Sequence, residues 1–249
     1  MEQNSLASTA FILVILAVMS IKMNAAVNVY LNTCQDFQAM QTGNSSVVYL
    51  LNQSIDCSRT TFTVINGSFS GTLDGQNFCI SNIFINESST SNVAIFSTGT
   101  SAVVTNLLLM NFTVSGSSMV GVLFGTCTSC SISNVTLNNT GSYTNSIVGY
   151  GKVGGLVGQA NSCVFSNCIV ANTYVSCSFQ YAGGLVGLAC TMNMTRCYNL
   201  GPLTNSSQVI INAAYNGGGL AGDCYTCRIT SSGVHRGHSS QRICHDFFH

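Results

Sequence analysis

A short glycine-rich phrase recurs along this chain and constrains its fold more than any other feature. It reads VGGLVG at 153–158, AGGLVG at 182–187 and GGGLAG at 217–222. Weaker versions are VGVLFG at 120–125 and NVAIFS at 92–97. The last residues of these phrases are 28, 33, 29 and 35 residues apart along the chain. A unit of this length is a structural repeat, and a fixed period is best sought before any other pattern.

Each unit consists of short runs of β-branched and aromatic residues broken by Gly, Ser, Asn and Thr, without helical periodicity. One such unit cannot bury its apolar face alone, so successive copies must stack. We therefore predict an all-β fold, a parallel β-helix (β-solenoid) over residues 69–233. A β-propeller blade needs about 40 residues, more than any interval here. The recurring glycines are expected to form tight corners with positive φ.

The N-terminus contains a signal-like segment. Residues 10–19, AFILVILAVM, form an apolar block followed by Ala25 and Ala26. The block is shorter than the roughly 20 apolar residues of a membrane span. It has the length of a secretory h-region, so we predict a signal peptide at 1–26 and no membrane span in the mature chain. An uncleaved anchor or a core helix is the alternative.

Residues 27–68 differ from the repeats and are expected to form an N-terminal cap and the first strands. CQDFQAM at 34–40 has a helical pattern, and VVYLLNQSIDC at 47–57 is typical of a buried strand.

The composition excludes some partners and suggests another solubilising surface. Only 6% of residues are charged and the net charge is zero, against roughly a quarter charged in typical soluble domains. No electrostatic footprint for nucleic acid is present. Asn-x-Ser/Thr sequons behind a signal-like segment indicate a glycoprotein. The nine candidates are Asn44, Asn52, Asn66, Asn86, Asn111, Asn134, Asn138, Asn193 and Asn205.

Thirteen cysteines indicate an oxidising compartment. Many recur at fixed offsets from the phrase and would stack on adjacent rungs about 4.8 Å apart, within the roughly 4.4–6.8 Å that a disulfide tolerates between Cα atoms. We expect Cys168–Cys197 and Cys130–Cys163 as the leading pairs. The disulfide candidates are Cys127, Cys130, Cys163, Cys168, Cys197, Cys224 and Cys227.

Cys-x-x-Cys pairs can also hold zinc, but these occupy repeated positions of the stack, so we expect no metal.

The repeats lack the side chains that most hydrolytic and lyase mechanisms use as acids and bases. Residues 88–222 contain no Asp, Glu or His, whereas glycoside cleavage ordinarily needs two carboxylates and other hydrolytic chemistry needs a base. The remaining acids considered are Asp56, Asp74 and Asp223. GYGKVG at 149–154 matches a dinucleotide-binding pattern by its letters, but strand-like sequence follows it instead of a helix. We expect no enzyme, no catalytic residues and no cofactor.

The tail, 234–249, lacks the repeat pattern and is expected to be irregular. It contains His235, His238, His245 and His249. A metal site through His235, His238, Cys244 and His245 is the alternative to a solvated tail.

The order FSGTLDGQNFCISNIFI at 69–85, followed by phrases such as GGLVG and then SNC, resembles proteins that carry the GLUG motif. The resemblance covers roughly 34–232 and is most specific at 154–158 and 183–187. It implies a right-handed β-helix and an adhesive or surface role. It supplies no shared catalytic residues.

These observations predict an extracellular or cell-surface adhesion module that reaches its location through the secretory pathway. Its partner would be a glycan or a protein, bound through many weak polar contacts on a rigid repeat surface. The alternatives are a structural coat or spacer protein and a carbohydrate-active β-helix enzyme.

Overall fold

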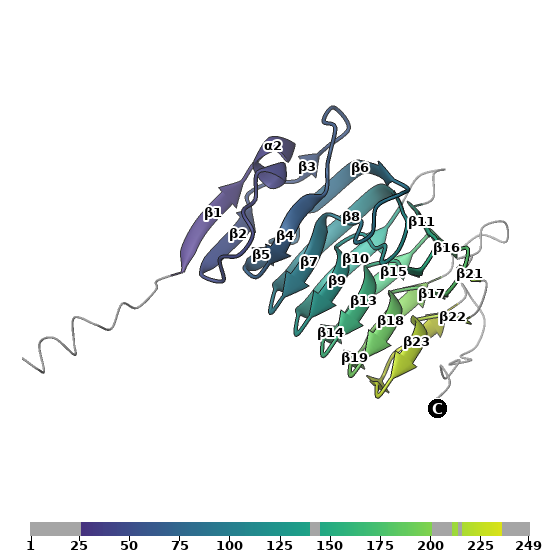
Figure 1. Ribbon diagram of the computed structural model, residues 1–249. Helices are drawn as coiled ribbons and strands as arrows, with labels where there is room; N and C mark the ends of the chain where they lie inside the picture. Colours follow the sequence, from purple (N-terminus) through teal and green to yellow (C-terminus); the bar gives the residue numbers. More distant parts are fainter. Residues whose placement is uncertain (1–25, 140–144, 201–210, 214–215, 236–249) are drawn as a thin grey trace, which may run out of the picture.

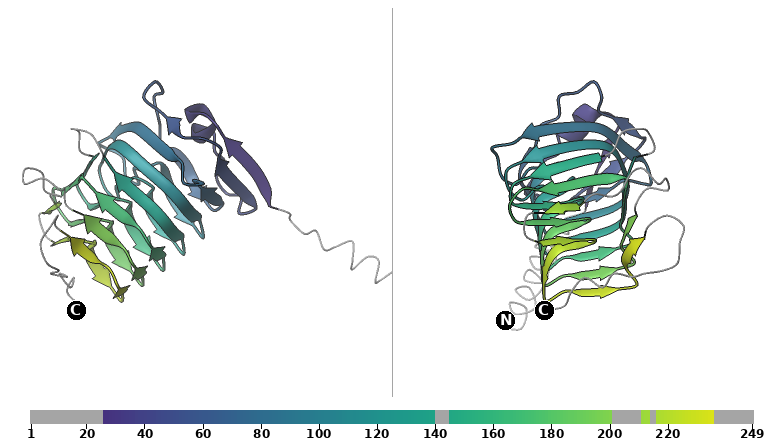
Figure 2. Two further views of the ribbon diagram at one scale, coloured as in Figure 1. Left: turned by 180° about the vertical axis from the view of Figure 1, so that it is seen from behind. Right: turned by 90° about the vertical axis from the view of Figure 1, so that its right-hand side faces the viewer.

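The computed structural model describes residues 26–139, 145–200, 211–213 and 216–235. Within these residues the chain winds into a β-solenoid whose strands stack side by side in parallel sheets (Figure 1). The view from the side shows the sheets wrapping one continuous core (Figure 2). The prediction of an all-β parallel solenoid is therefore confirmed.

The first and largest sheet has 16 strands. Its main path is β1 (Val27–Leu31), β2 (Val47–Leu51), β5 (Thr72–Asp74), β8 (Val103–Gly116), β10 (Ser131–Asn138), β14 (Val164–Ser166), β19 (Asn193–Thr195) and β24 (Arg228–Thr230). The strands that extend it are β3 (Ile55–Asp56), β6 (Cys79–Glu87), β11 (Asn145–Gly149), β15 (Ile169–Ala171), β16 (Thr173–Cys177), β20 (Tyr198–Leu200), β21 (Ile211–Ala213) and β25 (Gly233–His235).

Two smaller sheets complete the rungs. The six-stranded sheet contains β4 (Ile65–Phe69), β7 (Phe96–Thr100), β9 (Phe124–Thr128), β13 (Val157–Asn161), β18 (Val186–Cys190) and β23 (Ala221–Tyr225). The three-stranded sheet contains β12 (Lys152–Gly154), β17 (Tyr181–Gly183) and β22 (Asn216–Gly218).

The register of the six-stranded sheet follows the glycine phrase. Val157 of β13 pairs with Phe124 of β9 on one side and with Val186 of β18 on the other. The glycines that follow these residues therefore lie one above another, and the period read from the sequence is the period of the rungs.

A ladder of aromatic rings fills the N-terminal half of the core. Phe69, Phe96 and Phe124 are fully buried on β4, β7 and β9. Phe96 and Phe124 are register partners, whereas Phe69 is the partner of Gly99 and its ring reaches Phe96 from there. The ring centroids of Phe69 and Phe96 are 4.4 Å apart, and those of Phe96 and Phe124 are 5.4 Å apart. Stacked rings at this spacing add attraction beyond their buried area.

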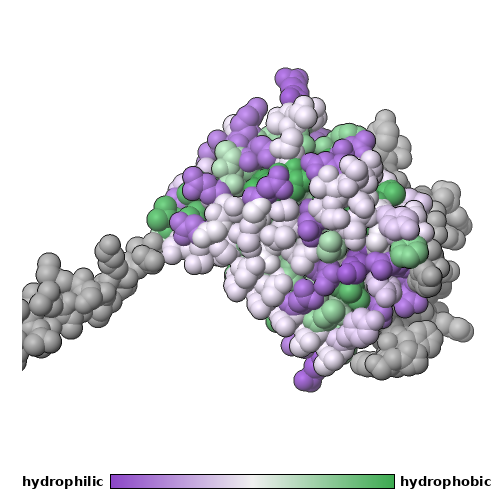
Figure 3. Space-filling model, viewed as in Figure 1, coloured by the Kyte–Doolittle hydropathy of each residue, from purple (hydrophilic) through white to green (hydrophobic). Residues whose placement is uncertain are grey.

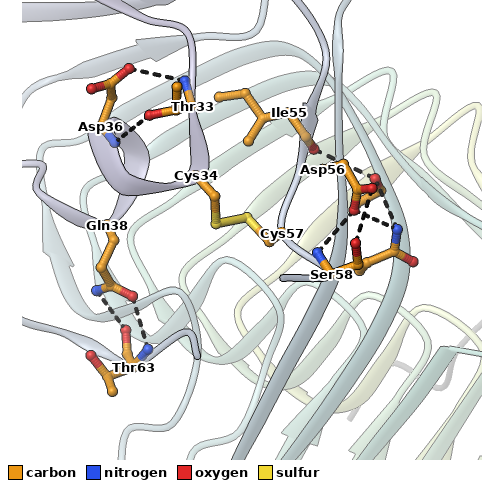
Figure 4. The surroundings of a disulfide bond; sticks show 11 residues. Thr33, Cys34, Asp36, Gln38, Ile55, Asp56, Cys57, Ser58 and Thr63 are labelled. Carbon is orange, nitrogen blue, oxygen red and sulfur yellow. Dashed lines mark hydrogen bonds between the residues drawn. A yellow bond between two sulfur atoms is a disulfide. The ribbon is translucent and has the colours of Figure 1, made fainter. Parts of the chain in front are cut away.

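The short helix α2 (Cys34–Gln38) lies over this end of the core. Thr33 caps it, because its hydroxyl accepts from the backbone N–H of Asp36 while the Asp36 carboxylate accepts from the backbone N–H of Thr33. Phe37 packs against the edge of Phe96, and a disulfide joins Cys34 to Cys57 (Figure 4). These contacts fix the helix on the first rungs.

The tight corners are made by asparagine, serine and threonine, so the expectation that the phrase glycines adopt positive φ is wrong. Among described residues, only Gly43 and Gly67 are glycines with positive φ. The left-handed corners instead hold residues such as Asn106 and Asn134, each at φ 52°, because asparagine tolerates this region better than most residues. The Asn134 Nδ2 donates to the Asn106 Oδ1 at 3.1 Å, so the corner residues also join neighbouring rungs.

The phrase glycines are required by close packing between rungs. A Cβ atom on Gly184 would collide with the carbonyl oxygen of Gly219 on the next rung and with the Asn199 side chain. A Cβ on Gly155 would likewise meet the carbonyl oxygen of Gly184. Glycine recurs here because backbones approach too closely for any side chain.

The described cysteines form three disulfides: Cys34–Cys57, Cys127–Cys130 and Cys224–Cys227. The expected Cys130–Cys163 bond is corrected by the structure, which joins Cys130 to Cys127 on the same rung and leaves Cys163 as a buried thiol. The repeat register predicts that the sulfurs of Cys130 and Cys163 lie close together. It does not predict whether Cys130 bonds to Cys163 or to the nearby Cys127.

Cys168 and Cys197 are fully buried thiols at equivalent positions of adjacent rungs. A hydrogen bond between the two side chains raises the pKa of Cys168 and lowers the pKa of Cys197. They are neighbours as the spacing predicted, but as a thiol pair.

Candidate binding face

The side of the six-stranded sheet that faces away from the core carries two parallel rows of side chains. We call this side the outer face. The pairing of β7, β9, β13, β18 and β23 aligns each row across the rungs. The first row is Thr98, Thr126, Gln159, Leu188 and Asp223. The second row is Thr100, Thr128, Asn161, Cys190 and Tyr225. Hydroxyl or amide groups thus repeat at the rung spacing of about 4.8 Å over the first three rungs, from β7 to β13. Leu188 and Cys190 interrupt the rows before Asp223 and Tyr225.

The surface of this side of the molecule is mildly polar. The face toward the viewer in Figure 1, where β7, β9, β13, β18 and β23 lie, is mostly pale or purple in Figure 3, with separate green patches. Thr100 and Thr128 are exposed, and Gln159 and Asn161 are half-buried. The rows therefore offer hydrogen-bonding groups with little charge.

The three-stranded sheet adds a basic group beside these rows. Its register aligns Lys152, Tyr181 and Asn216 on successive rungs. The Lys152 ammonium donates to the Gln159 Oε1 at 2.8 Å, and the Gln159 Nε2 donates to the Asn161 Oδ1 at 3.3 Å. One rung thus presents an ammonium and two amides joined in a hydrogen-bonded chain.

An acidic and aromatic group lies on the last described rung. The negative charge of Asp223 raises the pKa of Tyr225, and the neighbouring Tyr181 contributes in the same direction. A carboxylate beside a phenol disfavours the phenolate, and the Tyr225 hydroxyl is a hydrogen-bond donor. Its side chain is 54% exposed. An acceptor, a phenol donor and an aromatic surface are available together here.

The charges of Lys152 and Asp223 act on the pKa of Cys190 in opposite directions. Burial raises its pKa, Lys152 acts to lower it, and Asp223 acts to raise it further. We call Lys152, Gln159, Tyr181, Asp223 and Tyr225 the polar cluster. Stacking brings these residues together from three rungs and up to 73 sequence positions apart, so no local motif could have revealed the cluster.

The other two acids considered from the sequence hold turns. Asp56 accepts from the backbone N–H of Ser58 at 2.9 Å and from the Asn82 amide at 2.7 Å. Asp74 accepts from the backbone N–H of Gln76 at 2.9 Å. Both lie on early strands, β3 and β5, whereas Asp223 lies on β23 at the other end of the stack (Figure 1). The structure does not bring these three carboxylates together.

Most predicted glycosylation sites face solvent. The asparagine side chain is half-buried at Asn138, where its Oδ1 accepts from the Asn172 amide at 2.9 Å. Asn205 lies outside the described residues. The exposed sequon asparagines are Asn44, Asn52, Asn66, Asn86, Asn111, Asn134 and Asn193. The Nδ2 atoms of Asn52, Asn111 and Asn134 donate hydrogen bonds to neighbouring asparagine side chains.

Two other sequence features are placed only in part. GYGKVG forms the end of β11, a turn and the strand β12, so no helix follows its glycines. The signal-like segment 1–25 and the tail residues 236–249, with His238, Cys244, His245 and His249, lie outside the described residues. Across the part of the chain that the structure describes, no helix is long and apolar enough to span a membrane.

Comparison with known proteins finds one relative that matches part of the sequence and one solved structure with a similar fold. No family model matches the chain. A 96-residue stretch, 38% of the chain, is 45% identical to part of the protein named halomucin from Haloquadratum walsbyi (strain DSM 16790 / HBSQ001). The matched part spans only 1% of the length of that relative.

A solved structure from Bacteroides ovatus, described as a candidate immunoglobulin A1 protease, superposes with a TM-score of 0.63. The match covers 83% of this chain and 67% of that chain at 20% identity. At this level of identity the similarity shows the β-solenoid fold alone.

Proposed function

We propose that this chain is a secreted or cell-surface binding module that presents its outer face to a glycan ligand and catalyses no reaction. The observation that carries the proposal is the pair of polar rows that end in the polar cluster. The rows carry hydroxyl and amide groups on successive rungs, the polar cluster adds the charged Lys152 and Asp223, and the Tyr225 phenol is exposed at its end.

Neutral sugars suit such a surface. Their hydroxyl groups both donate and accept, as do the threonine hydroxyls and the amides of Gln159 and Asn161. The exposed ring of Tyr225 offers an apolar face for the C–H side of a sugar and a hydroxyl at its rim. Equivalent groups on successive rungs would engage several sugars of one chain at once, so weak contacts add into avidity.

Secretion and glycosylation are part of the same proposal. Three disulfides and seven exposed sequons support an extracellular location. The partial similarity to the protein named halomucin and the GLUG-like phrases support a surface role. N-terminal sequencing of secreted protein should begin near residue 26; material that retains the initial residues would indicate a membrane-anchored form instead.

Binding can be tested with a matched pair of tyrosine variants. Tyr225 and Tyr30 are exposed to nearly the same extent, 54% and 58%, but Tyr30 lies on β1 at the opposite end of the sheet stack. On a glycan array, Tyr225→Ala should weaken binding about tenfold, which equals about 1.4 kcal/mol, and Tyr30→Ala should bind as the wild type does. Equal binding by both variants would refute the outer-face assignment.

The same array separates the alternatives. A folded, secreted protein that retains no glycan would favour a structural coat or spacer. Sugar products released from the array would favour a carbohydrate-active enzyme.

A further inference from the structure

Three sulfur atoms lie together in the core between two neighbouring rungs. Cys127 and Cys130 form a disulfide where β9 passes into β10, and Cys163 lies just before β14 on the next rung. All three residues are buried, and their sulfur atoms all lie within 4.8 Å of one another. A thiol thus lies beside a disulfide in the buried interior of the stack.

Backbone hydrogen bonds hold the thiol in this position. The backbone N–H of Cys130 donates to the Cys163 sulfur at 3.4 Å. The single proton of the Cys163 thiol can be donated to the carbonyl oxygen of Cys127, 3.4 Å from the sulfur, or to that of Asn161, 3.2 Å away. The cysteine is therefore oriented by the same rung that carries the disulfide.

The register also accommodates a different bond. Ser131 pairs with Val164, so Cys130 and Cys163, which precede them, occupy equivalent positions in adjacent parallel strands. Strands are about 4.8 Å apart, and a disulfide tolerates Cα separations of roughly 4.4–6.8 Å. A Cys130–Cys163 bond would fit with little movement of the backbone.

We propose that Cys127, Cys130 and Cys163 form an intramolecular thiol–disulfide exchange site. Cys163, as its thiolate, attacks the sulfur of Cys130; the Cys130–Cys163 bond forms as the Cys127–Cys130 bond breaks. Cys127 leaves as a thiolate and takes up the proton that Cys163 lost. One disulfide and one thiol are present before and after, so no external oxidant or reductant is consumed.

The exchange changes which parts of the stack are covalently linked. The Cys127–Cys130 bond closes a sequence separation of 3 residues within one rung, whereas a Cys130–Cys163 bond spans 33 residues and joins two rungs. In the second state these rungs cannot separate without breaking a covalent bond. The site would therefore act as a switch between an unstapled and a stapled stack.

The chain contains its own control. Cys224 and Cys227 form the same short disulfide at register-equivalent positions of a later rung. On the adjoining described rung, Met192 occupies the position that corresponds to Cys163. A thioether cannot attack a disulfide in this way, so among the described residues no thiol stands beside Cys224–Cys227 at the position that Cys163 occupies beside Cys127–Cys130.

The wild-type protein can be mapped directly. Folded protein is incubated at pH 8, quenched in acid, unfolded in the presence of N-ethylmaleimide and digested with pepsin, which works at the acidic pH that suppresses exchange. We expect both linkages, with Cys163 alkylated in one population and Cys127 in the other, and a single linkage for Cys224–Cys227. A Cys127–Cys130 linkage alone after prolonged incubation would overturn the proposal. So would three reduced thiols that retain a metal ion.

A variant gives a second readout. Cys127→Ser leaves Cys130 and Cys163, which should form a disulfide when the protein folds with glutathione disulfide; each bond formed converts one glutathione disulfide into two glutathione thiols. Cys163→Ser should keep only the Cys127–Cys130 bond. A folded Cys127→Ser protein that retains both thiols would contradict the proposed geometry, and if this variant does not fold, the wild-type map decides.

Discussion

Truncation of the central ring in the aromatic ladder should destabilise the stack more than any surface change. Phe96 is fully buried and lies between Phe69 and Phe124, with centroid distances of 4.4 and 5.4 Å. Phe96→Ala removes the ring and leaves a cavity, which costs about 3–5 kcal/mol. Phe96→Leu keeps much of the volume and should cost about 1–2 kcal/mol, because mainly shape and ring stacking are lost.

Thermal unfolding followed by circular dichroism measures the effect. For a chain of this size about 4 kcal/mol corresponds to a fall of roughly 8–16 °C in Tm. Phe84→Ala is the control, since the Phe84 side chain is 62% exposed on β6 and should change stability by no more than about 0.5 kcal/mol. A Phe96→Ala protein as stable as the Phe84→Ala protein would refute the ladder as a main support of the core.

Three further predictions follow from the rungs. Gly184→Ala should cost about 1–3 kcal/mol in chemical denaturation, because the new Cβ meets the Gly219 carbonyl oxygen; wild-type stability would show that the rungs are farther apart. Asn106→Ala should cost about 1–2 kcal/mol for the left-handed corner, and Asn106→Gly should cost less than the alanine variant; the reverse order would exclude a backbone cause. Hydrogen bonds from Asn82 and Ser58 lower the pKa of Asp56, so the stability it contributes is present above about pH 4 and lost as the pH falls through its folded-state pKa. Asp56→Asn should thus flatten the acid limb of Tm against pH, and parallel curves for the two proteins would contradict this.

The rung period could be predicted from the sequence because close backbone packing leaves a local record. Gly155 and Gly184 tolerate no Cβ, so the phrase that contains them recurs on the later rungs, where the backbones approach this closely. The same register placed Cys168 beside Cys197 correctly. It could not choose among three nearby sulfurs, and the bond that forms is Cys127–Cys130 within one rung.

Other features depended on folding and left no local pattern. The left-handed corners needed residues that tolerate positive φ, and Asn106 and Asn134 meet this need while they also bond to each other. From sequence alone, asparagine there is indistinguishable from asparagine in any polar loop. The polar cluster is a second case. Lys152 and Asp223 come near Cys190, and Asp223 and Tyr181 come near Tyr225, only after the rungs stack.

The most direct test of binding without catalysis measures both on one sample. The mature chain is applied to a panel of immobilised polysaccharides, and retained protein and released reducing ends are quantified together. The account predicts retention on at least one polysaccharide, weaker retention of Tyr225→Ala, and no more reducing ends than a heat-denatured control releases. Sustained release of reducing ends by the wild type, abolished by Asp223→Asn or Asp74→Asn, would contradict it.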